Sequence, residues 1–97
     1  MKAVFVVFNQ SLSGRVKEIF DQLSIKGFTQ WINITGSGSD KGIPHEGTHT
    51  WPELNNAFLT VIGDEMVPAL LEKIQLLNKE VEDQGLRAFT WNIESVV

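Results

Sequence analysis

The sequence predicts an α+β domain in which two helices cover one face of a four-stranded antiparallel sheet. Four short segments have the apolar or alternating pattern of strands, and two others repeat apolar residues at helical spacing, in the order βαββαβ. Right-handed crossovers fold this order into a ferredoxin-like sandwich. A chain of 97 residues fits one domain, 1–97. Its one long insertion, at 36–52, lies where a hairpin normally needs two to five residues.

The four predicted strands are residues 2–9, 28–35, 54–63 and 86–93. The first, "KAVFVVFN", is apolar on both alternating faces, which is typical of a central strand buried on both sides. The last also carries apolar residues on both faces. Because a two-layer sandwich covers only one face of its sheet, we expect copies of the chain to associate through the other face. The alternative is a monomer with a wide, partly apolar open face.

Two helices connect these strands. Ser11 and Ser13 offer N-caps to the first helix, and Gly27 is expected to end it. Asp64 is expected to start the second helix, and Gly85 to close it. The apolar stripes that face the sheet are Leu12, Val16, Ile19, Phe20 and Leu23 in the first helix and Val67, Leu70, Leu71, Ile74, Leu77 and Val81 in the second.

Charge and composition exclude several classes of function. The formal charge is −4 and the isoelectric point is near 5.0, so the chain lacks the basic field of a nucleic-acid-binding protein. It has no cysteine, which excludes disulfides, thiolate metal sites and cysteine nucleophiles. The apolar run near the N-terminus is too short to span a bilayer and lacks a cleavage site, so we expect a cytoplasmic protein without membrane insertion.

The 36–52 segment contains "HEGTH", which matches the zinc-protease pattern H-E-x-x-H. That chemistry needs a helix, and Pro44, Gly47 and the neighbouring threonines disfavour one. The pattern therefore does not indicate a metalloprotease. His45, Glu46 and His49 still form a candidate site for a divalent metal (Zn, Cu or Ni), since neutral imidazoles bind these ions well. The alternative is that they are solvated loop residues.

Immediately before this motif, "TGSGSDKG" spans residues 35–42. Glycines at a strand end let backbone N–H groups approach an anion, although a flexible connector has the same composition. Together with Gly27-Phe28-Thr29 and the strand between, this run resembles the PII signalling family (nitrogen regulatory protein P-II, GlnB-like), which has a G-x-G-x-x-K-G run at the base of a long T-loop. The CutA family is a weaker resemblance, because it normally has a short loop here.

The resemblance implies a homotrimer packed through its open sheet faces. It also implies that adenine nucleotides or other anions bind in clefts between subunits, and that the T-loop docks on a partner enzyme or membrane transporter. The candidate ligand-binding residues are Gly36, Ser37, Gly38, Lys41, Gly42 and Arg87, and the candidate docking residues are Ile43 and Trp51. Asp40, the absence of tyrosine and the acidic "EDQGLR" segment depart from the family pattern and mark a divergent member.

Three functions remain to be compared. The first is a trimeric regulator that responds to a small effector and docks through 36–52. The second is a metal sensor or buffer associated with metal efflux, using the two histidines and Glu46. The third is an enzyme, and no spacing of nucleophile, base or paired carboxylates in this sequence supports it. We therefore expect a protein without catalytic activity.

Overall fold

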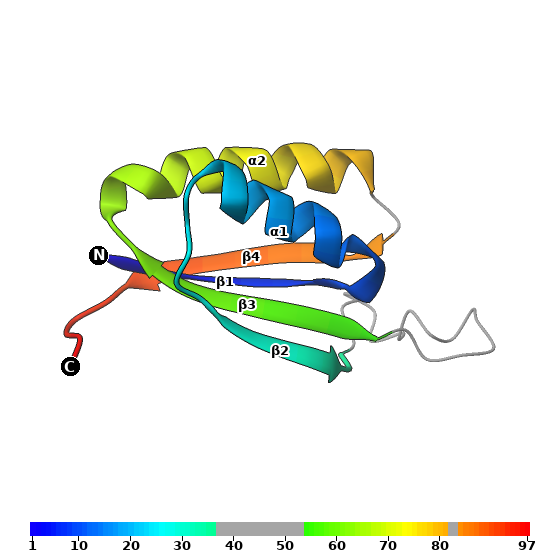
Figure 1. Cartoon of the computed structure of the whole chain (residues 1–97), viewed down its shortest axis with the longest axis horizontal. Coiled ribbons are helices and arrows are strands. Elements are labelled where there is room, and N and C mark those ends of the chain that lie inside the picture. The colour runs from blue at the N-terminus through cyan, green and yellow to red at the C-terminus, as the bar shows by residue number, and fades with distance from the viewer. Residues whose placement is uncertain (37–53, 82–83) are drawn as a thin grey trace.

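The computed structural model describes residues 1–36, 54–81 and 84–97. Two helices lie on one face of a four-stranded sheet (Figure 1). The strand order is β2-β3-β1-β4, and every neighbouring pair is antiparallel, which confirms the predicted ferredoxin-like fold. The elements are β1 (Lys2–Asn9), η1 (Gln10–Leu12), α1 (Ser13–Gln22), β2 (Thr29–Ile34), β3 (Asn55–Ile62), η3 (Asp64–Met66), α2 (Val67–Glu80) and β4 (Leu86–Asn92).

The hydrophobic core fills the space between the sheet and the two helices. Both predicted helical stripes face it, and so do Val4, Val6 and Phe8 of β1. Four phenylalanines form a continuous edge-to-face and tilted cluster with ring centroids 4.6–5.4 Å apart, a favoured arrangement for aromatic rings. They are Phe8, Phe20, Phe28 and Phe58. This cluster joins both central strands to α1, so it anchors the whole two-layer arrangement.

Both helices differ from the predicted bounds at their ends. Helix α1 stops at Gln22, five residues before Gly27, and Ser24 takes the left-handed conformation (φ 58°) that was expected of a glycine. At the start of α1 the serines do not act as caps, because Leu12 holds the N-cap position. Asp64 begins a single 3-10 turn, and α2 starts at Val67. No helix in the described part of the chain is long and apolar enough to cross a membrane.

Strand β2 contains a bulge that the sequence pattern does not show. Trp31 pairs with Ala57 and Ile34 pairs with Asn55, so three residues advance on β2 against two on β3. Asn33 lies in this bulge with φ 59°, a left-handed conformation that asparagine tolerates better than most residues. Asn33 lies three residues before Gly36, so the bulge is at the end of β2 that leads to this glycine.

Candidate functional site

One end of the sheet gathers the segments that the sequence associates with ligand binding. β1 and β2 finish at this end and β3 and β4 begin there, on the side of the molecule away from both chain termini (Figure 1). The Asn9 backbone N–H donates to the carbonyl of Gly85 (3.1 Å), and the Gln10 N–H donates to the carbonyl of Leu54 (2.9 Å). These bonds fix the start of β3 and of β4 against the turn between β1 and α1.

A buried asparagine ties the β2 bulge to the same turn. Asn56 is only 4% exposed, and its Oδ1 accepts hydrogen bonds from the Asn33 backbone N–H (3.2 Å) and from Gln10 Nε2 (3.4 Å). Its Nδ2 donates to Ser13 Oγ (2.7 Å), and Gln10 Nε2 also donates to Asn33 Oδ1 (2.5 Å). Both the oxygen and the nitrogen of the Asn56 amide are therefore hydrogen-bonded, as a buried polar group requires. These bonds link β3, which carries Asn56, to β2 and α1.

Replacing Asn56 with alanine is expected to destabilise the fold by about 1–3 kcal/mol, because the Asn33 N–H and the Ser13 hydroxyl lose their partner. The free energy of unfolding in urea measures this cost. Asn92→Ala is the matched control, since Asn92 is exposed and its side chain accepts a single hydrogen bond, from Lys2. Equal losses in the two variants would show that the buried amide contributes no more than a surface one.

The sheet face opposite the helices is apolar and uncovered in a single chain. Register places its side chains in rows across the four strands in the order β2, β3, β1, β4. Four of its large residues remain between 38% and 54% exposed: Trp31, Val61, Phe89 and Trp91. The rows are Trp31–Ala57–Val7–Arg87, then Thr29–Leu59–Phe5–Phe89, then Val61–Ala3–Trp91. We call these residues the open face.

Arg87 is the only charged residue in the three rows of the open face. It is exposed, and none of the described carboxylates forms an ion pair with it. Gly36 follows β2, while Arg87 belongs to β4 at the other edge of the sheet. Of the predicted ligand-binding residues these two are the ones described, and one chain does not bring them together.

The remaining predicted site residues lie outside the described residues. They are Ser37, Gly38, Lys41 and Gly42 of the ligand group, Ile43 and Trp51 of the docking group, and His45, Glu46 and His49 of the metal group. In the part of the chain that the structure does describe, no cluster of histidine, aspartate and glutamate side chains has the geometry to hold a metal ion. The metal site stays a prediction from the sequence.

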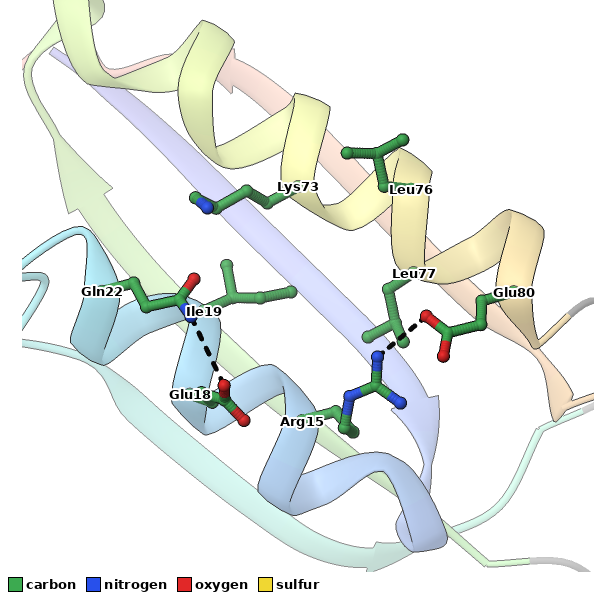
Figure 2. Close-up of a pocket in the computed structure, with 8 residues that line it drawn as sticks. All are labelled: Arg15, Glu18, Ile19, Gln22, Lys73, Leu76, Leu77 and Glu80. Carbon is green, nitrogen blue, oxygen red and sulfur yellow. Dashed lines mark hydrogen bonds and ion pairs between the residues drawn. The ribbon is translucent and has the colours of Figure 1, made fainter.

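A groove of about 190 Å³ runs between α1 and α2, on the outer side of the helical layer. Figure 2 shows Ile19 and Leu77 between the two helices and the ion pair from Arg15 to Glu80 bridging them (2.8 Å). Leu76 is 59% exposed. A second bond joins Gln22 to Glu18 along α1 (3.4 Å). Arg15 of this groove is already paired with Glu80, and Glu18 lines the groove together with Lys73, so the open face is the stronger candidate for an anion site.

The Arg15–Glu80 pair makes a small, pH-dependent contribution to stability. The hydrogen bond from Arg15, and then its charge, lowers the pKa of Glu80 below the ordinary value of 4.5. The contribution is therefore complete above about pH 4.5 and is lost as the pH falls through the lower folded pKa. We expect Glu80→Gln to be slightly less stable than wild type at pH 7 in low salt. The difference in urea midpoint should shrink as the pH falls below 4.5 toward the lowered folded pKa of Glu80, and it should also shrink in 1 M salt.

Trp31 and Asn56 were not singled out for the site from the sequence. Trp31 stands at an alternating position of its strand, which indicates its face of the sheet but not that it shares a row with Arg87. Asn56 is the second of two adjacent asparagines at the start of an otherwise largely apolar strand, and this pair is the only local signal in the sequence. Its partners lie 23 and 43 residues away in the chain, so spacing does not reveal them.

Comparison with known proteins matches residues 1–97 to the family "Nitrogen regulatory protein P-II". No curated protein sequence matches the chain. Among solved structures, CPII of Thiomonas intermedia, a nitrogen regulatory PII-like protein, is similar in its complex with ADP and bicarbonate (23% identity, TM-score 0.73, 95% of this chain and 84% of that one). Its complex with ADP, AMP and bicarbonate is similar as well (20%, TM-score 0.72, 95% and 88%).

A PII-like signalling protein of Thermus thermophilus is also similar (22% identity, TM-score 0.65, 95% of this chain and 85% of that one). At these identities the solved structures establish the fold alone. The family match spans the whole chain and agrees with the strand order, the two-helix layer and the long insertion between β2 and β3. The chain therefore belongs to the nitrogen regulatory protein P-II family.

Proposed function

We propose that this protein is a trimeric regulator, not an enzyme, that acts in the cytoplasm. It binds an adenine nucleotide or a similar anion in clefts between its subunits. The residues Gly36, Ser37, Gly38, Lys41, Gly42 and Arg87 are its proposed ligand group. It then docks on a partner enzyme or transporter through the 36–52 segment, with Ile43 and Trp51 as proposed contact residues.

The observation that carries this proposal is the uncovered open face. Aromatic side chains that remain about half exposed on one sheet face are typical of a surface that is buried in an assembly. A closed ring of copies would bury all of them at once. The family match supports a regulatory role, and the similar CPII structures contain ADP, AMP and bicarbonate.

The placement of the ligand group supports a site between subunits. Gly36 and Arg87 lie at opposite edges of one sheet, so a ligand that touches both needs the edge of a second copy. Arg87 has no ion-pair partner among the described residues, which leaves its guanidinium available for an anion.

A thermal-shift titration with ADP, AMP and bicarbonate, each alone and in combination, tests the proposal. A ligand that binds the native state raises the unfolding midpoint by mass action. We expect ADP to raise it in wild type and to raise it much less in Arg87→Met. Arg15→Met is the matched control, because Arg15 lies on the helix layer and is paired with Glu80. No shift with any of these ligands up to millimolar concentration would contradict nucleotide and bicarbonate binding.

A further inference from the structure

Trp31 and Arg87 occupy the two ends of the same row of the open face. Trp31 pairs with Ala57, Ala57 with Val7, and Val7 with Arg87. Three strand spacings separate the ends, which is roughly 14 Å. In one chain the Trp31 ring packs edge-on against Phe5, with centroids 5.9 Å apart, and 41% of the residue is exposed. The cation–π contact found among the described residues joins a different pair, Lys17 and Phe28.

An assembly about an axis that runs along the strands changes this arrangement. Such an axis keeps every row at its own height, and it brings the β2 edge of one copy beside the β4 edge of the next. The row that begins with Trp31 then meets a row that ends with Arg87. Within each chain the middle of this row consists of Ala57 and Val7, which are small, so the bulky side chains of the row stand at its two edges.

We propose that Trp31 of one copy stacks on the guanidinium of Arg87 of the next copy and holds it for the ligand. The role of this contact in ligand binding rests on the proposed function, and the contact itself requires the assembly of two or more copies. Trp31 is then a positioning residue, because it acts through Arg87. The site is incomplete in one chain, since each Arg87 depends on its neighbour's indole.

The chemistry of the two groups fits this role. Arginine stacks its planar face on an aromatic ring, and tryptophan provides the strongest such surface. Stacking uses the faces of the guanidinium and leaves its N–H groups, which lie in the plane, free to donate to a phosphate or a carboxylate. It also gives a partner to the one charge in the three described rows of the open face, where an unpaired charge would oppose association.

A double-mutant cycle between Trp31→Leu and Arg87→Met tests the contact without any ligand. Mass photometry would give the protein concentration at which each variant dissociates. We expect each single variant to dissociate at a protein concentration about tenfold higher than wild type does. The double variant should dissociate at a concentration no higher than that of the less stable single variant. Trp91→Leu is the matched control, because Trp91 lies on the same face and on the strand of Arg87 but two rows away. Its effect should simply add to that of Arg87→Met.

ADP affinity supplies the readout that a purely structural role would not move. At a concentration where all variants are assembled, Trp31→Leu should weaken the affinity for ADP about tenfold relative to wild type. Trp31→Phe should keep most of the wild-type affinity, because phenylalanine retains an aromatic face. Trp91→Leu should bind ADP within twofold of wild type. Additive effects on dissociation would overturn the Trp31–Arg87 contact while leaving nucleotide binding intact. Coupled dissociation without any ADP binding in wild type would instead retain the contact and overturn the proposed ligand. A monomeric wild type would overturn both.

Discussion

Phe89→Asp is expected to abolish assembly and, with it, ligand binding. Phe89 lies in the middle row of the open face and is 54% exposed in one chain, so aspartate is tolerated in the isolated fold. In the assembled protein the same carboxylate would be buried among Phe5, Leu59 and their copies without a partner, and such burial costs several kcal/mol per charge. In the proposed trimer three symmetric copies would multiply that cost, so we expect light scattering to report single chains.

Leu76→Asp is the matched control for this change. Leu76 is exposed to a similar degree, 59%, but it lies on α2, in the layer opposite the open face. It should leave the mass and the ADP response of the protein unchanged. Circular dichroism would verify that both variants remain folded. A Phe89→Asp protein that keeps the mass of wild type would show that the open face is not the assembly surface.

Phe58→Ala is expected to cause the largest loss of folding stability, about 3–5 kcal/mol. Phe58 is 2% exposed and packs against three other phenylalanines at 4.6–5.2 Å, so its removal leaves a cavity at the centre of the aromatic cluster. Stability of this size is a large fraction of what a small domain possesses, so the variant should be partly unfolded at 37 °C. Urea unfolding of the variant and of wild type measures the difference.

Phe58→Leu is the control for this cavity, since leucine fills much of the same space and should cost clearly less than alanine. If alanine and leucine at position 58 destabilise the protein equally, then packing of the cluster does not hold the two layers together, and another part of the core must do so.

The layer arrangement could be predicted because it depends on apolar periodicity. The first strand is apolar on both faces, and the structure places its apolar even-numbered residues against the helices and Ala3, Phe5 and Val7 on the open face. The same alternation along the last strand groups Phe89 and Trp91 on one face, and the structure shows that this is the open face. Both helical stripes face the core for the same reason, because the spacing of apolar residues along the sequence matches the period of the helix.

The features that were not predicted depend on contacts between distant residues. At the β2 bulge the side-chain Oδ1 of Asn56 accepts a hydrogen bond from the backbone N–H of Asn33, and no local pattern in "TQWINI" signals an extra residue. The early end of α1 reflects Ser24, whose left-handed conformation is stabilised by the bonds that follow the helix and not by its own preference. Of the candidate site, alternation indicates the face of Arg87, but only strand register reveals that Trp31 shares its row.

The mass of the wild-type protein in solution, by light scattering over a range of concentrations, tests the central claim most directly. The claim is that the open face is buried between copies and that the ligand site lies where their edges meet. This claim requires a measured mass of three times the 10.9 kDa of one chain. The same mass should be found at every concentration down to the low micromolar range. A mass of 10.9 kDa at high concentration would contradict it, because the open face would then be a solvent-exposed surface and no cleft between subunits would exist.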